Sequence, residues 1–430
     1  MDRERRVLEG DMLLVAGRIE AVGPRLRAPR GVTVIDCARK AILPGLVQAH
    51  VHLCQVLFRN HADGLELLDW LRDRIWPLEA AHDARSLGLS ARLGIAELLL
   101  GGTTAVLDMG TVHHTEEIFR AADESGIRYT GGQALMDQGE GMPTRLRQSA
   151  KVALREATAL GQRWHGRGGG RLRHALCPRF VLSCSEGLLR DTVAIAAREA
   201  WTIHTHASEH PAETRLVKQI VGDDNAAYFH HLGIRGPNVV LAHCVHLTGR
   251  EERLIARAGT HVVHCPGANL KLGSGIAPIV RMKQRGVSLA LGGDGAPCNN
   301  TLDIFHEMRL AATLQVPRFG PRAVSAADVL EMATRGGAHA LGLGDEIGSL
   351  EVGKRADVTV VDVDRPHVSP RGHDLHATVV YGARASDVTD VWVDGRRLVR
   401  DSALTTLDAR ALSRASGGEI QRLLKRARIK

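Results

Sequence analysis

The sequence predicts an α/β protein: a TIM-like (β/α)8 barrel inserted in a small β-sandwich domain that the N- and C-terminal segments form together. Three observations predict it. Eight short apolar runs alternate with amphipathic segments along the middle of the chain, and eight strand–helix repeats are typical of this barrel. Both ends carry short strand-like stretches with glycine turns, which suit tight hairpins. Several of the apolar runs are followed at once by residue types that bind metals.

The eight runs have the Val-, Leu-, Ile- and Ala-rich composition of buried strands. Amphipathic segments such as Asp83–Leu100 and Leu247–Ala258 separate them, and we expect these segments to be the outer helices. The runs are Ala41–His52, Thr104–Met109, Arg128–Met136, Leu172–Phe180, Trp201–His206, Val239–Cys244, His261–Pro266 and Ser288–Asp294.

We expect three regions along the chain. Residues 45–349 would form the barrel, residues 1–44 together with 350–406 the small β domain, and residues 407–430 a charged C-terminal helix. This division follows from the change between strand–helix alternation and glycine-punctuated strands.

Composition narrows the classes of function. The net charge of +8 is the balance of 56 basic and 48 acidic residues without a dense basic run, which argues against a nucleic-acid or membrane partner. No apolar stretch is long enough to span a membrane, and the first residues lack the apolar core of a signal peptide. Seven cysteines without a C-x-x-C pair are typical of reduced thiols, so we expect a cytoplasmic protein.

Five metal-binding residues stand just past apolar runs. They are His50, His52, His206, His243 and Asp294. In a parallel barrel every strand delivers its last residues to the same end, where active sites lie. Neutral imidazoles with one carboxylate suit Zn²⁺ or Fe²⁺. A lone H-x-H pattern is weak evidence, so the joint placement at four strand ends carries this interpretation.

This set of residue types suits hydrolysis. Three histidines and an aspartate can hold a divalent metal that keeps one position open for water and lowers the pKa of that water. A carboxylate beside the metal can take the proton of the water. Glu209, three residues after His206, stands where a glutamate could carry a proton to a substrate, and a further histidine could hydrogen-bond the developing oxyanion.

The motifs around these residues resemble the amidohydrolase superfamily. They are P-G-L-V-x-A-H-x-H, H-A-S-E, L-A-H-C-V-H-L, N-L-K-L-G-S-G-I-A-P, G-x-D-G-A-P-x-N-N and the late G-S-L-E-V-G-K-R-A-D-V-T-V-V-D. The similarity covers nearly the whole chain and is to the mononuclear aminohydrolases that act on purines, nucleosides and s-triazines. Binuclear relatives usually offer a bridging lysine near the fourth strand, and Leu172–Phe180 contains none.

The resemblance implies roles for individual residues. It implies one divalent metal ion, with Zn²⁺ expected first and Fe²⁺ as the alternative, held by His50, His52, His206 and Asp294. Glu209 would be the proton shuttle. His243 would orient the attacking hydroxide and assist Asp294.

The resemblance also suggests substrate-binding residues. In adenosine-type deaminases a tryptophan at the place of Trp70 packs on the nucleoside, and a glutamate at the place of Glu79 accepts hydrogen bonds from ribose hydroxyls. Gln55 and Arg179 favour a different ring as the substrate, because in guanine deaminases a glutamine and an arginine at these places contact the purine edge. Asn269 would also orient the substrate.

The leading hypothesis is a metal-dependent hydrolytic deaminase of an aminopurine nucleoside, such as 5'-deoxyadenosine, methylthioadenosine, S-adenosylhomocysteine or adenosine. A second hypothesis keeps the metal and changes the ring, giving a deaminase or chlorohydrolase of guanine, a pterin or an s-triazine. A third is a catalytically silent scaffold that binds a partner. For either enzyme we expect a small heterocyclic substrate and a homo-oligomer.

The start of the chain raises a further hypothesis. Relatives usually open with an extra strand, whereas the match here begins at Met1, as if translation began upstream. Without that strand, Met12–Val15 would present unpaired backbone groups along a sheet edge. We expect a form extended upstream to be more stable and less prone to aggregation, with similar chemistry.

Overall fold

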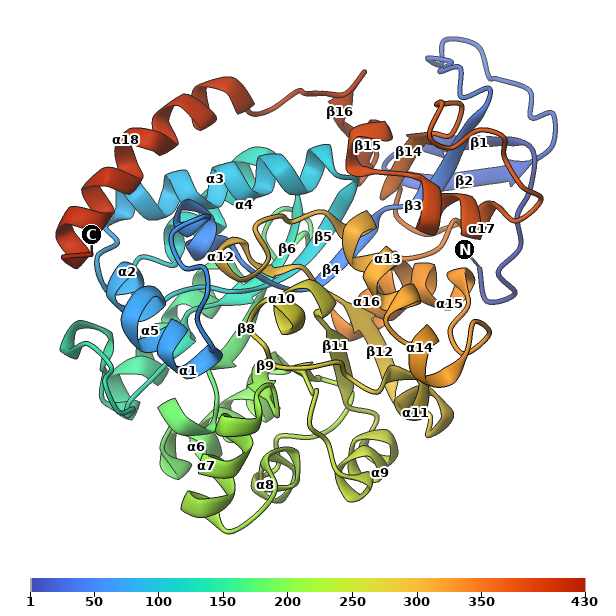
Figure 1. Ribbon diagram of the computed structural model, residues 1–430. Coiled ribbons are helices and arrows are strands. Elements are labelled where there is room, and N and C mark those ends of the chain that lie inside the picture. Colours follow the sequence, from blue (N-terminus) through green and yellow to red (C-terminus); the bar gives the residue numbers. More distant parts are fainter. Residues whose placement is uncertain (1, 430) are drawn as a thin grey trace.

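The computed structural model describes residues 2–429, and a closed parallel sheet lies at its centre (Figure 1). Its strands follow the order β12-β11-β10-β9-β8-β6-β5-β4-β13, and β7 pairs with β8. The last predicted run, Ser288–Asp294, leads into both edge strands of this order, because β12 pairs with β11 and β13 pairs with β4. The sheet therefore closes on itself. These strands are β4 Leu46–His52, β5 Thr103–Met109, β6 Arg128–Gly132, β7 Ala134–Leu135, β8 Leu172–Pro178, β9 Thr202–Ala207, β10 Val239–His243, β11 His261–His264, β12 Ser288–Leu291 and β13 Asp294–Gly295. The predicted barrel is confirmed.

Helices surround the barrel and connect its strands (Figure 1). Asp83 and Thr248 cap the N-termini of α3 and α9 through capping boxes, which satisfy backbone N–H groups that a helix start leaves free. The helices of the barrel region are η1 Leu53–Phe58, α1 Leu67–Trp70, η2 Leu71–Ile75, α2 Trp76–Ala80, α3 Ala84–Leu100, α4 Glu116–Ser125, η3 Thr144–Leu146, α5 Ala150–Trp164, η4 Val181–Ser183, α6 Glu186–Glu199, α7 Pro211–Val221, α8 Asn225–Leu232, α9 Gly249–Ala258, α10 Pro266–Lys271, α11 Ile279–Gln284, α12 Ala296–Asn299, α13 Ile304–Thr313, α14 Val316–Phe319, α15 Ala326–Glu331, η5 Met332–Gly336 and α16 Gly337–Ala340.

The apolar core divides along the barrel strands. Neighbouring residues of one strand, such as Val106 and Leu107 or Leu289 and Ala290, belong to different buried clusters. Successive side chains of a strand point to opposite faces, so one face of a strand packs toward the surrounding helices and the other toward the barrel interior. Val, Ala and Leu fill both layers with few aromatic residues, as the composition requires.

The small domain draws on both ends of the chain. An antiparallel sheet has the order β17-β16-β15-β14-β3, where β3 precedes the barrel and β14 follows it. Its strands are β3 Lys40–Pro44, β14 Val358–Asp362, β15 Val388–Val393, β16 Arg396–Arg400 and β17 Ala403–Leu404, and the short helices α17 Leu375–Ala377, η6 Thr378–Gly382 and η7 Ala385–Asp387 lie between β14 and β15. The β3–β14 pairing places the barrel within this domain, in agreement with the predicted fold class.

One predicted run is divided between the two sheets. Ala41–His52 breaks at Gly45, and β3 joins the small sheet while β4 joins the barrel. A Cβ atom at Gly45 would lie 2.1 Å from Thr104 Oγ1. Glycine therefore allows the chain to pass closely beside β5 as it moves from one sheet to the other.

The two ends of the chain lie apart from the barrel core. The hairpin of β1 Asp11–Val15 and β2 Arg18–Gly23 forms a two-stranded sheet, and residues 2–10 contain no strand. The effect of an upstream extension on stability stays a prediction. Helix α18, Ala409–Ala427, packs against α3 through its buried Ile420 and Leu423 (Figure 1). Within residues 2–429, no helix has both the length and the apolarity that a membrane crossing needs.

A buried ion-pair network joins the barrel to the small domain. Arg128 of β6 is fully buried, and its Nε and Nη2 atoms lie 2.8 and 2.9 Å from the carboxylate oxygens of Asp357. Its Nη2 also donates to Asp394 at 2.5 Å. Asp357 itself has a side chain that is only 1% exposed. The guanidinium therefore neutralises a carboxylate that water cannot solvate.

We expect Arg128→Ala to lower the free energy of unfolding by about 3–5 kcal/mol, because it leaves the Asp357 carboxylate buried without its partner. Urea denaturation followed by circular dichroism measures this loss. Arg400→Ala, which removes an exposed arginine of β16, is the matched control. A loss below about 1 kcal/mol, the range of an exposed pair, would contradict the structural role of the network.

Candidate metal centre

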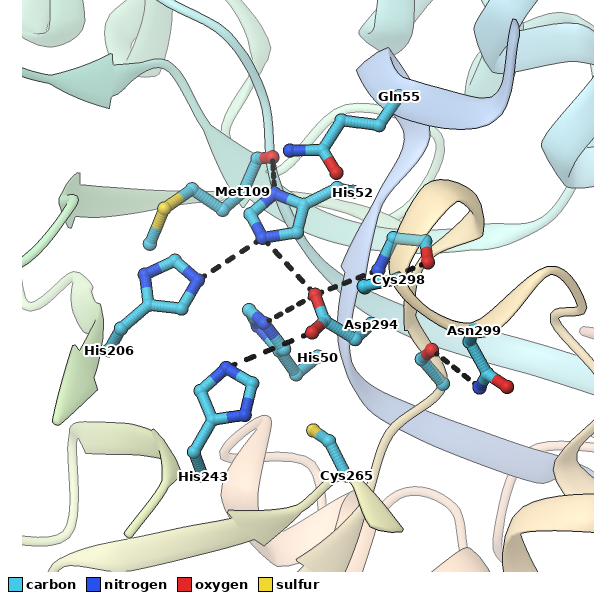
Figure 2. Close-up of polar contacts among 12 residues, drawn as sticks. His50, His52, Gln55, Met109, His206, His243, Cys265, Asp294, Cys298 and Asn299 are labelled. Carbon is cyan, nitrogen blue, oxygen red and sulfur yellow. Dashed lines mark hydrogen bonds and ion pairs between the residues drawn. The ribbon is translucent and has the colours of Figure 1, made fainter. Parts of the chain in front are cut away.

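The five predicted residues meet at the carboxyl end of the barrel (Figure 2). His50 and His52 end β4, His206 lies near the end of β9, His243 ends β10, and Asp294 begins β13. Two overlapping groups have their donor atoms within 4.8 Å of one another: His50, His206 and His243, and His50, His52 and Asp294. The placement at strand ends therefore brings residues far apart in sequence to one point.

The inner nitrogen atoms are closely spaced. His52 Nε2 lies 3.1 Å from His206 Nε2 and 3.4 Å from Asp294 Oδ1 (Figure 2). His50 Nε2 lies 3.2 Å from the same carboxylate oxygen. These atoms surround a common centre, as ligands of one ion do.

The outer nitrogen atoms of the same rings are held by hydrogen bonds. His52 Nδ1 lies 2.8 Å from the carbonyl oxygen of Met109, and His206 Nδ1 lies 2.7 Å from that of Arg179. A carbonyl only accepts, so each Nδ1 carries the proton and each Nε2 turns a lone pair inward. His50 Nδ1 contacts His204 Nε2 at 2.9 Å. Such outer partners fix ring orientation around metals.

The protonation states suit a cation. Burial lowers the pKa of His50, His52 and His206, in the case of His52 to about 3. Burial raises the pKa of Asp294, but the neighbouring histidines outweigh it and hold that pKa well below its ordinary value. Neutral imidazoles and an ionised carboxylate are the forms that bind metals.

A divalent metal fits these residues. The two Nε2 lone pairs of His52 and His206 face each other at 3.1 Å without a proton between them, which is unfavourable unless a cation lies there. His50 Nε2 is buried and makes no hydrogen bond within residues 2–429. Three imidazole nitrogens and one carboxylate form a set that Zn²⁺ and Fe²⁺ both accept.

Glu209 and His243 lie beside the ligands. Glu209 Oε2 is 3.5 Å from His243 Nε2, which is 3.9 Å from Asp294 Oδ2. Burial, with further contributions from the charges of Asp294 and Glu213, raises the pKa of Glu209 well above its ordinary value. This shift favours the protonated form of the Glu209 carboxyl, which is the form that can donate a proton.

Asn269 holds the ring of His243. Its Oδ1 lies 2.9 Å from His243 Nδ1, which leaves Nε2 directed toward Glu209 and Asp294. Asn269 is fully buried and does not line the cavity described below. The contact that the structure shows for Asn269 is with His243, and the expected contact with the substrate stays a prediction.

The backbone is strained around the centre. Ser208, His243, Cys244 and Asp294 all have positive φ angles, from 49° to 72°. Left-handed backbone at residues other than glycine costs free energy and clusters at functional sites. These turns aim the strand-end side chains at one another, and no sequence pattern reveals them.

A small cavity opens onto the centre. Its lining residues come from the strand ends and from the segment Leu67–Leu71, and they are His52, Leu67, Trp70, Leu71, Arg179, Phe180, His206, Glu209, His243, Leu272 and Asp294. The free volume is about 20 Å³, close to the roughly 10–15 Å³ that one water needs. In this conformation the cavity therefore has room for about one water.

The remaining expected substrate contacts divide into two groups. Trp70 and Arg179 line the cavity, whereas Gln55 and Glu79 lie behind it. Arg179 Nη1 and Nη2 lie 2.7 and 3.1 Å from the Glu79 carboxylate, and Gln55 Nε2 donates to it at 2.8 Å. Burial raises the pKa of Glu79, but the charge of Arg179 outweighs it and leaves the pKa below its ordinary value.

Comparison with known proteins agrees with this geometry. Residues 41–398 match the model of the amidohydrolase family. The 5'-deoxyadenosine deaminase of Methanothermobacter thermautotrophicus is 38% identical over 419 residues, covering 96% of this chain and 95% of that protein. The 5-methylthioadenosine/S-adenosylhomocysteine deaminase of Desulforudis audaxviator is 37% identical over 420 residues, covering 97% and 95%.

Among solved structures, a zinc-bound adenosine deaminase from Xanthomonas campestris superposes with a TM-score of 0.90. It is 33% identical, and the match covers 96% of this chain and 93% of that one. Family match, relatives and superposition agree with one another and with the resemblance inferred from the motifs. The chain therefore belongs to the amidohydrolase family.

Proposed function

We propose that this protein is a metal-dependent hydrolytic deaminase of an aminopurine nucleoside. The observation that carries the proposal is the buried Glu209 carboxyl beside His243 and Asp294, in a cavity that Trp70 also lines. The deaminases among the relatives support the same chemistry. The substrate would be 5'-deoxyadenosine, methylthioadenosine, S-adenosylhomocysteine or adenosine.

His50, His52, His206 and Asp294 would hold one divalent cation, Zn²⁺ or Fe²⁺. Such a cation, when bound with an open position, lowers the pKa of a water toward neutrality. The near approach of His52 Nε2 and His206 Nε2 supports this assignment, because both atoms offer lone pairs to the same point.

The other residues would move protons and orient the reactants. Asp294 would take a proton from the attacking water, and Glu209 would donate one to a ring nitrogen, so that the amino-bearing carbon accepts the hydroxyl oxygen. His243, whose ring Asn269 holds, would orient the attacking water through Nε2. The hydroxyl proton would return to Glu209 and Asp294 would pass its proton to the amino group, so that ammonia leaves and the ring keeps the oxygen as a carbonyl.

Three wider expectations belong to this proposal. The seven cysteines are free, and six of them are buried, which supports the expected cytoplasmic location. A homo-oligomer and the absence of nucleic-acid or membrane partners stay predictions.

Ammonia release across a panel of substrates tests the proposal. We expect the purified enzyme to deaminate the named aminopurine nucleosides with a higher kcat/KM than guanine, pterins or amino-s-triazines. Preference for a free heterocycle would overturn the nucleoside assignment. Ammonia from no member of the panel, with metal bound, would overturn the deaminase itself.

A further inference from the structure

Glu307 of α13 is a fully buried residue that the proposed chemistry does not use. Its carboxylate accepts hydrogen bonds from two segments, α10, which follows β11, and the segment that leads from Asp294 into α12. We infer that Glu307 is a positioning residue that links these two segments, and so holds Asp294 at the metal and His243 beside it. The part of this inference that concerns the reaction rests on the proposed function.

The two carboxylate oxygens of Glu307 are divided between the two segments. Oε2 accepts from the backbone N–H of Gly267 at 3.0 Å, and Oε1 accepts from Asn299 Nδ2 at 2.8 Å. An ionised carboxylate is an acceptor at both oxygens, whereas an amide has one acceptor and one donor. A glutamate can therefore accept from both segments at once, and a glutamine cannot.

The contact with Asn299 leads to the aspartate ligand. Asn299 Nδ2 also donates to the carbonyl oxygen of Gly293 at 2.9 Å, and Gly293 directly precedes Asp294 (Figure 2). Asp294 has a φ angle of 59°, a left-handed conformation that persists only where surrounding contacts maintain it. One amide group therefore joins Glu307 to the turn that directs the Asp294 carboxylate.

The contact with Gly267 leads to His243. Gly267 lies in the first turn of α10, two residues before Asn269, whose Oδ1 is 2.9 Å from His243 Nδ1. A Cβ atom at Gly267 would lie 2.5 Å from Glu307 Oε1 and 2.6 Å from Asn299 Oδ1. Glycine is therefore required for this close approach, and the helix that carries Asn269 packs directly on the Glu307 carboxylate.

Glu307 is buried without a cationic partner. Within residues 2–429 its only polar contacts are those with Gly267 and Asn299. Burial raises the pKa of Glu307 to about 7, although both N–H donors favour the charged form. A glutamate is almost never fully buried unless it is paired. The contacts that accompany this unfavourable burial are those with the two segments, which indicates a role in placing them.

Lys271 forms a second link between the same segments. It ends α10, and its Nζ donates to the carbonyl oxygen of Pro297 at 2.9 Å and to Asn300 Oδ1 at 2.8 Å. The Lys271 side chain is 24% exposed, so this link lies nearer the surface than the Glu307 carboxylate. Because it remains when Glu307 is replaced, we expect a Glu307 variant to fold with the two segments less precisely placed.

The variant Glu307→Gln tests the positioning role. Its amide can accept from one segment, and its NH₂ group then faces an N–H donor of the other. We expect the dissociation constant for Zn²⁺ to rise by about 10- to 100-fold, the usual effect of removing an outer partner of a metal site. Competition between the holoenzyme and a chelating indicator at fixed pH measures this constant without any substrate. A rise that stays below this range would overturn the inference.

Glu252→Gln is the matched control for Glu307→Gln. Glu252 is also a fully buried glutamate, and its two carboxylate oxygens lie 2.6 and 2.9 Å from Arg281 and Arg285. We expect Glu252→Gln to lower the melting temperature and to leave the dissociation constant for Zn²⁺ unchanged. If this control weakens zinc binding as much as Glu307→Gln does, the loss reports general destabilisation, and the positioning role is overturned.

A double variant tests the path to Asp294. We combine Glu307→Gln with Asn299→Ala, which removes the amide that joins Glu307 to the Asp294 turn. If Glu307 acts through Asn299, the double variant has about the zinc dissociation constant of the weaker-binding single variant. Independent effects would multiply, and that result would overturn the inference.

Ammonia release separates this inference from the proposed function. With Zn²⁺ in excess, so that the sites are filled, we expect Glu307→Gln to lose about 10- to 100-fold in kcat. We expect KM to stay unchanged, because Asp294 and His243 act on the attacking water. A normal kcat in the zinc-loaded variant would overturn the inference while the deaminase assignment stands. Wild-type enzyme that releases no ammonia would overturn the proposed function, and the zinc measurements would still decide the role of Glu307.

Discussion

Glu209→Gln is expected to keep its metal and to lose about 10²–10⁴-fold in kcat, the usual contribution of a general acid–base group. Burial and the charges of Asp294 and Glu213 raise the pKa of the wild-type carboxyl, which favours the protonated form that can donate. An amide has the same shape but cannot transfer a proton to a ring nitrogen. Steady-state ammonia release, with elemental analysis of the same preparations, measures both quantities.

Glu20→Gln is the matched control for Glu209→Gln, because it makes the same chemical change at an exposed position. We expect it to leave kcat unchanged. A Glu209→Gln enzyme with near-normal kcat would remove this residue from the mechanism. Loss of metal from the variant would show that Glu209 stabilises metal binding. The loss of activity would then be no evidence for proton transfer by Glu209.

His206→Ala is expected to lose metal and activity together, from about one equivalent per wild-type chain to a small fraction. The variant removes one of the inward-facing nitrogens and leaves an incomplete site of two imidazoles and a carboxylate. Elemental analysis after dialysis and ammonia release measure the two losses. The fold should survive, because the His206 side chain makes one hydrogen bond from its outer nitrogen, to Arg179.

His373→Ala is the matched control, as this histidine is exposed and remote in sequence from every predicted ligand. We expect it to retain metal and activity. Two full equivalents of metal in the wild type, both needed for turnover, would contradict the mononuclear assignment. Full activity in a metal-free His206→Ala preparation would contradict the metal centre.

Much of the architecture was predictable because it depends on local pattern. Strand–helix alternation predicted the closed barrel, and all eight runs contain strands. The same rule predicted the centre, because parallel strands deliver their last residues to one end. His50, His206 and His243 therefore meet although three different strands carry them.

Other features were not predictable from the pattern. The break at Gly45 follows from a close approach to Thr104, and the positive φ angles of His243 and Asp294 leave no mark in hydrophobic periodicity. The carbonyl oxygens of Met109 and Arg179 hold ligand rings, and every residue has a carbonyl. These contacts depend on how strand ends turn, which the sequence pattern does not specify.

By itself, the sequence determined the barrel, its insertion in a sheet made from both ends, and the identities of the residues at its catalytic end. These follow from periodicity and residue type, which act over a few neighbouring positions. Only the tertiary structure decided that Glu79 faces Arg179 and that Asn269 faces His243. Which polar groups meet in a buried space depends on packing between distant segments, since every buried donor or acceptor takes the partner that the closed fold places beside it.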